Sequence, residues 1–187
     1  MVDLGTLHGT SSTSGRAWGI NHGGDVVGLS RNEANTTSQA TLWRGGTPGT
    51  AANLGALVEG GFSSAYAVND RCWAVGESAA TGGNTRATLW RDGRVEELAR
   101  IDRRRHSRAN DVNNRGQMVG HVTSFVGAPS TEGMAVLWQG DGVVNLNDLL
   151  QEGSGWVLRS AEGINSRGQI TGYGFGGQTR SFVLTLG

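Results

Sequence analysis

The amino-acid sequence predicts an all-β fold, a β-propeller of four four-stranded blades, and an internal repeat is the main evidence. The motif Ala-x-x-(Ile/Val)-Asn-x-x-x-x-(apolar)-x-Gly occurs four times in the 187 residues. Its asparagines are Asn21, Asn69, Asn113 and Asn165. Repeats of this length without helical patterning are typical of propellers or β-solenoids. A content of 32 glycines and 2 prolines fits many tight turns between short strands.

Two further segments recur in step with this motif, so each repeat holds four short apolar segments, which we interpret as strands. One segment reads Ala-x-Leu-Trp and the other Asp-Leu-Gly-x-Leu. Apolar alternation and β-branched residues favour strands over helices. In the first repeat the expected strands are Arg16–Asn21, Asp25–Ser30, Gln39–Arg44 and Ala51–Leu57. At Asn147–Gln151 a short helical turn is an open alternative.

A short Asn-x-x-Gly turn is expected to join the first two strands of each repeat. Asparagine can hydrogen-bond its own backbone, and glycine supplies the left-handed residue that such a turn needs. The second repeat has Cys72 in place of this glycine. A positive φ at Cys72 would cost on the order of 1 kcal/mol relative to glycine.

The side chains at two repeated positions match the geometry of blades around an axis. A constant alanine is expected where the first strands converge and little space remains, and the tryptophans are expected in the wider core between blades. The alanines are Ala17, Ala65, Ala109 and Ala161, and the tryptophans are Trp43, Trp90 and Trp138.

The chain is expected to form one domain over residues 1–187, with repeats at about 8–57, 58–101, 102–149 and 150–187 plus 1–7. It opens with a fourth-type strand at Val2–Leu7 and ends after a third-type strand at Ser181–Thr185. We therefore expect the opening strand to complete the last blade and close the ring. Four blades could close within a monomer, and two chains could form one eight-bladed ring as a homodimer.

Composition excludes several classes of chemistry. All 16 basic residues are arginine, so no Schiff-base or phosphate-loop lysine exists, and the single cysteine allows no intramolecular disulfide. The formal net charge is zero, so we expect no nucleic-acid partner, and the run Arg100–Arg108 is interpreted as a solvated loop. The four histidines lack metal-ligand spacing, so we expect neither metal nor cofactor. Without a leader or an 18-residue apolar run, a cytoplasmic chain without membrane contact is expected, or an extracellular one if a leader was removed.

Taken together, the repeated segments resemble the HAF-type repeat family, which is found mainly in bacteria. The resemblance rests on Asp-Leu-Gly-x-Leu, Ala-x-Gly-Ile-Asn-x-x-Gly-x-Val-Val-Gly and Ala-x-Leu-Trp in fixed order, and it covers Asp3 to Leu184. The His-Ala-Phe strand that names the family appears here as Gln39-Ala40-Thr41 and its counterparts. The resemblance implies a β-propeller-like fold and implies no particular chemistry.

A candidate site follows from the positions at which the repeats differ. Long, dissimilar connections are expected on one face, where the first strands enter the axial funnel. The residues after the constant alanine are Trp18, Tyr66, Asn110 and Glu162, and those before it are Arg16, Ser64, Arg108 and Ser160. Such a set suits an organic ligand with an apolar body and an anionic or carbonyl group. The same residues could instead only fill gaps between unlike blades. Further candidates near this face are His8, His106 and Trp156.

The function expected first is binding of a small organic metabolite at the mouth of this funnel. The alternative is a cofactor-independent cyclase or isomerase of secondary metabolism, in which Glu162, Arg108 and Arg16 supply hydrogen bonds or acid–base help to an already reactive substrate. A third possibility is a module that binds glycans or proteins.

Overall fold

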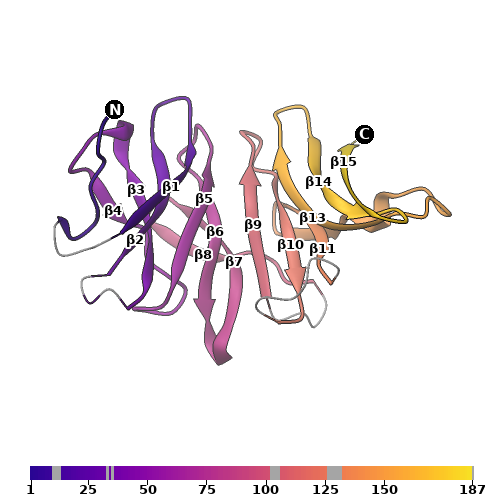
Figure 1. The fold of residues 1–187 in the computed structure, drawn as a ribbon, viewed down its shortest axis with the longest axis horizontal. Helices are drawn as coiled ribbons and strands as arrows, with labels where there is room; N and C mark the ends of the chain where they lie inside the picture. The colour runs from indigo at the N-terminus through magenta and orange to yellow at the C-terminus, as the bar shows by residue number, and fades with distance from the viewer. Residues whose placement is uncertain (10–13, 33, 35, 102–105, 126–131, 187) are drawn as a thin grey trace.

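A computed structural model describes residues 1–9, 14–32, 34, 36–101, 106–125 and 132–186, and it is all-β, as predicted. Its strands form four antiparallel sheets, each built from strands consecutive in the chain (Figure 1). The first sheet contains β1 (Gly15–Ile20), β2 (Val26–Arg31), β3 (Ser38–Trp43) and β4 (Ala51–Asn53). The second contains β5 (Ser63–Val68), β6 (Ala74–Ala80), β7 (Asn84–Arg91) and β8 (Arg94–Glu97). The third contains β9 (His106–Val112), β10 (Met118–Thr123), β11 (Met134–Gln139) and β12 (Gly142–Asn145). The fourth contains β13 (Val157–Ile164), β14 (Gln169–Phe175) and β15 (Thr179–Thr185).

The strands expected for the first repeat match β1 to β4, except that the fourth is shorter. It ends at Asn53, and the chain then leaves the sheet as a linker to the next one. Leu146–Leu149 forms a 3₁₀ helix, which agrees with the helical alternative expected nearby. The turn mechanism is also confirmed, because the Asn113 side-chain oxygen accepts the backbone N–H of Gln117 at 3.0 Å, and the other three repeats share this contact.

Cys72 adopts φ 60° at the position where the other repeats have glycine. Its Sγ donates to Asp25 at 3.0 Å, so replacing Cys72 with glycine removes this hydrogen bond as well as the strain. Comparing Cys72→Gly with Cys72→Ala separates the two effects, because both lose the thiol and only glycine relieves the backbone. We expect Cys72→Gly to be more stable than Cys72→Ala by about 1 kcal/mol in urea unfolding. Equal stability of the two variants would contradict the strain at this turn.

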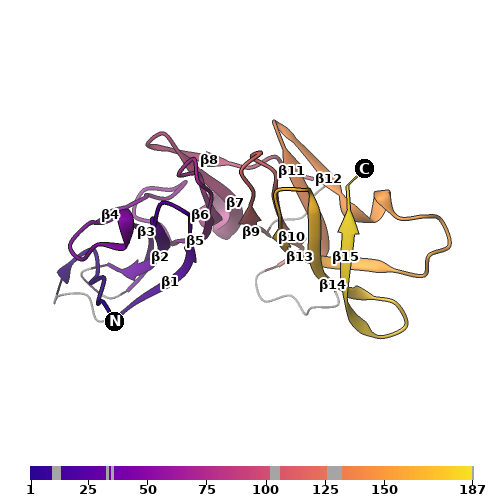
Figure 2. The ribbon, with the colours of Figure 1, turned by 90° about the horizontal axis from the view of Figure 1, so that it is seen from above.

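The four sheets lie in a row, and the core consists of the layers between neighbouring sheets (Figure 2). The tryptophans are buried as predicted, with 2, 3 and 1 % of Trp43, Trp90 and Trp138 exposed. Each indole N–H donates to a carbonyl of the linker that enters its sheet. The acceptors are Gly5, Gly55 and Ala99, at 3.2, 3.2 and 2.8 Å. The tryptophans therefore attach each linker to the sheet that follows it.

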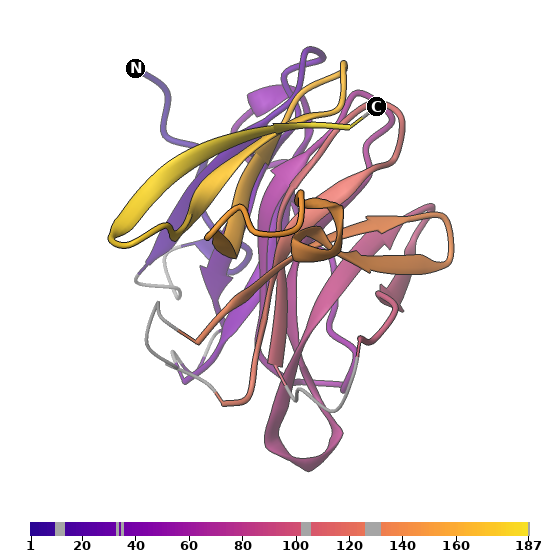
Figure 3. The same ribbon diagram turned by 90° about the vertical axis from the view of Figure 1, so that its right-hand side faces the viewer.

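The expected closure by the first residues is wrong within a single chain. Residues 1–9 contain no strand, and among the described residues the fourth sheet has only three, with β15 at its edge (Figure 3). The opening segment instead packs on the first sheet, where Gly5 accepts from Trp43 and the Leu7 N–H donates to Ser30 Oγ at 3.4 Å. This segment therefore acts as the linker into the first sheet. The two termini consequently lie at opposite ends of the long axis (Figure 1).

Every first strand contains a β-bulge at the position after the constant alanine. In the second sheet, Ala65 pairs with Gly76 and Ala67 pairs with Val75, so Tyr66 is the extra residue. The corresponding bulge residues of the other sheets are Trp18, Asn110 and Glu162. A bulge redirects side chains away from the regular alternation of a strand. The repeat thus presents one redirected side chain per sheet.

Candidate functional site

A polar cluster runs from the first sheet to the fourth. It contains the four bulge residues together with Ser64, Arg108 and Ser160, which precede constant alanines. Tyr66 lies at its centre. The ring centroids of Trp18 and Tyr66 lie 5.0 Å apart, and the guanidinium carbon of Arg108 lies 4.2 Å from the ring centroid of Tyr66. Its hydroxyl donates to Glu77 Oε1 at 2.7 Å. Among the described residues, Arg108 makes no ion pair with a carboxylate. Its charge is therefore available to an anionic group of a ligand.

The cluster continues through Asn110 into the fourth sheet. Asn110 accepts from Arg108 Nε at 2.7 Å and donates to the carbonyl of Ala161 at 2.8 Å. Ser160 follows, with its hydroxyl 2.5 Å from Glu162 Oε1 and 3.1 Å from His121 Nδ1. A hydroxyl placed between an imidazole and a carboxylate can donate to either of them. These contacts bring together candidates that lie far apart in the sequence.

Burial is the largest cause of the pKa shifts in this cluster. It raises the pKa of Glu77, and the hydrogen bond from Tyr66 and the charge of Arg108 act against this shift. It also raises the pKa of the Tyr66 hydroxyl, with the neighbouring carboxylate of Glu77 as the next cause. Burial, followed by the charge of Arg108, lowers the pKa of His121 to about 4. His121 is therefore a neutral imidazole at pH 7, which can either donate or accept a hydrogen bond.

A cavity of about 190 Å³ opens beside the cluster between the second and third sheets. Glu77, Arg108 and His121 line it, together with Thr85, His106, Ser107 and Thr123. It lies where β9 begins and β10 ends, next to the connections that were expected to be long and dissimilar. Residues 102–105 of the arginine run and residues 126–131 lie outside the described residues.

Several predicted site residues lie at the margin of this cluster or outside it. His106 lines the cavity and accepts the Thr85 N–H at 3.1 Å, and Ser64 is buried beside Tyr66. Arg16 is exposed on β1 at the end of the row. His8 contacts Gln39 of the first sheet. Trp156 packs over Gly176 and lines an apolar hollow beside Phe182, away from the cluster.

Sequence reasoning missed three members of the site, namely Glu77, His121 and Tyr173. Each follows the constant glycine of its second strand and pairs across the sheet with a predicted residue: Ser64, Arg108 or Ser160. The first repeat has Leu29 at this position. A signal was present, because this position holds four different residue types while its neighbouring glycine is constant.

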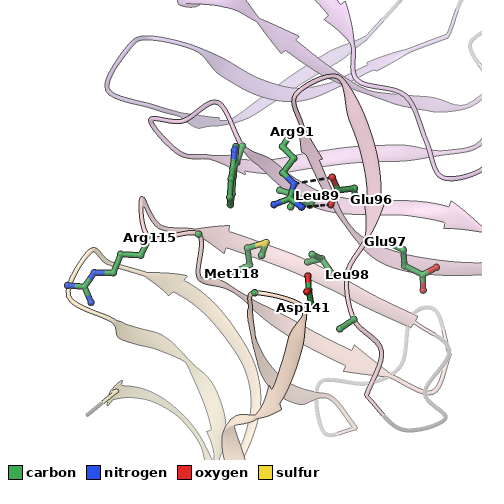
Figure 4. Close-up of a pocket in the computed structure, with 12 residues that line it drawn as sticks. Leu89, Arg91, Glu96, Glu97, Leu98, Arg115, Met118 and Asp141 are labelled. Atoms are coloured by element: carbon green, nitrogen blue, oxygen red, sulfur yellow. Dashed lines mark hydrogen bonds and ion pairs between the residues drawn. The ribbon is translucent and has the colours of Figure 1, made fainter.

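Two larger grooves lie on the outer side of the row and follow the repeat. One is lined by Leu89, Arg91 and Met118 between the second and third sheets (Figure 4), and the other by the equivalent Leu42 and Arg44 between the first and second sheets. Their volumes are about 370 and 280 Å³. In the first groove Arg91 pairs with Glu96 at 2.8 Å, so these two charged groups satisfy each other. The cavity beside the polar cluster has a smaller volume than either groove, but buried titratable groups line it. Titratable groups with shifted pKa values are typical of functional sites.

Across the described residues, no group of three or more His, Cys, Asp or Glu side chains could hold a metal ion. In the same parts of the chain, no helix has the length and apolar character needed to span a bilayer. Comparisons with protein-family models, with curated proteins and with solved structures find no match.

The low pKa of His121 predicts a sensitivity to acid. An unfolded chain takes up this proton as the pH falls below 6.5, whereas the folded chain resists until about pH 4, so stability is lost over this window. We expect His121 to account for about 2 to 3 kcal/mol of the stability lost between pH 7 and pH 4.5. Arg108 opposes the imidazolium and Glu162 favours it.

Urea unfolding at the two pH values tests this contribution. His121→Gln should reduce the loss of stability by that amount, whereas His22→Gln, on an exposed turn, should leave it unchanged. An acid response of His121→Gln equal to that of the wild type would contradict burial of a neutral imidazole.

Proposed function

We propose that this chain is a β-propeller protein of the HAF-repeat type that binds a small organic molecule at the polar cluster. The supporting observation is that the same bulge, repeated in four sheets, carries Trp18, Tyr66, Asn110 and Glu162. If these bulges served only to fill space between sheets, similar apolar residues would suffice at each one. A different polar or aromatic group at every bulge is the composition of a recognition site.

The ligand class follows from the groups that converge there. Trp18 is partly exposed beside Tyr66, and such rings accept a flat apolar body. Arg108 adds a positive charge next to these rings, and charge-assisted bonds from arginine favour a carboxylate. The ligand we propose is therefore an aromatic or conjugated carboxylate of metabolite size.

Titration with a panel of aromatic carboxylates that includes 4-hydroxycinnamate, followed by calorimetry and amide NMR, tests this proposal. Binding should shift the amide signals of Asn110 and Ser160, and the methyl esters should bind at least tenfold more weakly. Arg108→Gln should also weaken binding at least tenfold, about 1.4 kcal/mol. The control Arg167→Gln removes an equal charge from an exposed turn of the fourth sheet and should bind normally. The proposal fails if no member of the panel shifts the signals of the cluster.

An enzymatic role is the second candidate, because the hydroxyl of Ser160 lies between a neutral imidazole and a carboxylate. His121 could accept a proton from a bound substrate and return it at another position, which is the requirement of a cofactor-independent isomerase or cyclase. Turnover by the wild type and by one variant separates the two roles. If the chain is an enzyme, the wild type should convert a bound ligand, and His121→Gln should abolish turnover and keep ligand binding. If the chain only binds, the wild type should show no turnover and His121→Gln should still bind the ligand.

A further inference from the structure

The outer face of the first sheet resembles an interior surface that lacks its neighbour. Ile20 ends β1 and is 68 % exposed, whereas the equivalent Val68, Val112 and Ile164 are 8, 6 and 7 % exposed. Ala17 is exposed as well, although the equivalent alanines of the other sheets are fully buried. In the other sheets these positions are covered by the sheet that precedes them in the row. The first sheet therefore offers the same apolar surface to a partner.

The fourth sheet presents the complementary surface at the other end of the row. Val183 of β15 is 68 % exposed, whereas the equivalent Leu42, Leu89 and Leu137 are 6, 3 and 5 % exposed. An apolar hollow of about 330 Å³ lies beside it, lined by Trp156, Leu158 and Leu184 among others. Among the residues that the structure describes, no strand pairs with the outer edge of β15 (Figure 3). Within the described residues, this end therefore has three strands, and no further sheet packs on it.

A ladder of asparagine hydrogen bonds gives the row a direction. Asn21 Nδ2 donates to the carbonyl of Asn69, Asn69 to that of Asn113, and Asn113 to that of Asn165, at 3.1, 3.0 and 3.0 Å. Asn165 is exposed, and no carbonyl of a further sheet lies before its amide within the described residues. At the other end, no asparagine amide of a neighbouring sheet donates to the carbonyl of Asn21 within the described part of the chain; it accepts only from Gly24 of its own turn there. The last donor and the first acceptor are thus complementary.

Charge at the two ends is complementary in the same direction. Across two of the three interfaces the residue before the constant alanine meets the bulge residue of the preceding sheet: Arg108 meets Tyr66, and Ser160 meets Asn110. Continuing this series past the fourth sheet would place Arg16 against Glu162. Both are exposed at the ends of the row.

The opening segment has the register needed to complete the fourth sheet. Asp3 and Leu4 correspond to Asn53 and Leu54, so Met1 to Asp3 correspond to β4. In the first sheet, Ala52 pairs with Leu42. By the same register Val2 would pair with Val183, and both side chains are exposed.

We propose that two copies of this chain join head to tail into a ring of eight sheets. The first sheet of each copy covers the fourth sheet of the other, and Met1–Asp3 adds the missing strand to the partner's sheet. The occupant is a second copy because apolar surface, hydrogen-bond donor, charge and strand register at one end each match the other end. The four sheets form an open row whose ends lie far apart, so one chain cannot satisfy its own ends (Figures 1 and 2). Head-to-tail interfaces close into rings when the rotation permits.

Mass in solution, measured by sedimentation and light scattering, tests this ring. At micromolar concentration we expect one species at twice the mass of the 19.6 kDa chain. Ile20→Asp should raise the dissociation constant about 100-fold and leave the monomer folded, because Ile20 is exposed within one chain. Val144→Asp, at a partly exposed valine on β12, should remain dimeric. A monomeric wild type would overturn the proposal, and so would a series of larger oligomers, because that series indicates an open filament.

A cysteine pair tests the register independently of affinity. In a Cys72→Gly background, Val2→Cys with Val183→Cys should oxidise to a covalent dimer, whereas Val2→Cys with Thr179→Cys, at the far end of β15, should not. A disulfide within one chain would show that the chain closes on itself, and equal cross-linking of both pairs would contradict the register. Neither experiment depends on the ligand proposed above, so the two proposals can fail separately.

Discussion

Gly120→Ala is expected to lower the free energy of unfolding by about 3 to 5 kcal/mol. A Cβ atom at this position would lie 1.9 Å from the backbone oxygen of Arg108 and 3.0 Å from the Cα of Ala109. Both contacts are to the backbone of β9, so no side-chain rotation relieves them. Relief requires β9 to move away from β10, and this movement disrupts the bulge at Asn110. Urea unfolding followed by circular dichroism measures the loss.

Gly142→Ala is the matched control, because it replaces a glycine at the start of β12 in the same sheet. Its nearest neighbour would be the backbone oxygen of Gln139 at 3.6 Å, an ordinary contact, and we expect a change within about 1 kcal/mol. If Gly120→Ala is as stable as Gly142→Ala, the close approach at the bulge is not a constraint of the fold. The same contact occurs at Gly28, Gly76 and Gly172, at 1.8, 1.9 and 2.0 Å, so any of them can replicate the result.

The close contact between the constant glycine and the neighbouring strand is a part of the site that could be predicted only in part from the sequence. The constant glycine and the variable residue after the constant alanine were both visible in the repeat. Their relation was not, because alternation over a six-residue strand does not reveal one extra residue. Glu77 and His121 were missed for the same reason, since their closeness to Ser64 and Arg108 depends on strand register. Register arises from backbone hydrogen bonds between strands, which a periodic pattern does not specify.

The four sheets, their turns and the buried tryptophans were predicted correctly from the sequence. The closure of the ring by the opening strand was predicted wrongly for a single chain. The segment Val2–Leu7 is expected to be a strand because the fourth strand expected in the first repeat, Ala51–Leu57, contains the same motif. In the structure that copy of the motif lies mostly in a linker, since β4 ends at Asn53 and Gly55 already contacts Trp90 of the next sheet. The motif Asp-Leu-Gly-x-Leu contacts the sheet that follows it, so its presence does not show that the segment itself is a strand of another sheet. The opening segment therefore packs on the first sheet.

Asn113→Asp is expected to lower the free energy of unfolding by about 3 kcal/mol, the second large effect. The Asn113 amide donates to the carbonyl of Asn165 at 3.0 Å and to Gln117 Oε1 at 2.8 Å, and the side chain is buried. Aspartate has the same shape, but it presents a carboxylate oxygen to two acceptors. The side-chain oxygen that accepts from Arg115 and Gln117 is retained, so the turn itself remains supported. The loss then measures the bond between the third and fourth sheets together with the bond to Gln117.

Asn165→Asp supplies the comparison, because the same turn ends the row there. Its amide meets Gln169 Oε1 at 2.7 Å, and the side chain is exposed. Both substitutions are best measured in an Ile20→Asp background, where association does not contribute, and there Asn165→Asp should cost about 1 kcal/mol or less. In the wild-type background Asn165→Asp should also weaken the proposed dimer, because its amide is the donor that would meet Asn21 of the second copy. Equal losses for the two substitutions in the monomeric background would mean that the loss comes from the amide bond within each turn, and that the bond from Asn113 to Asn165 contributes nothing measurable.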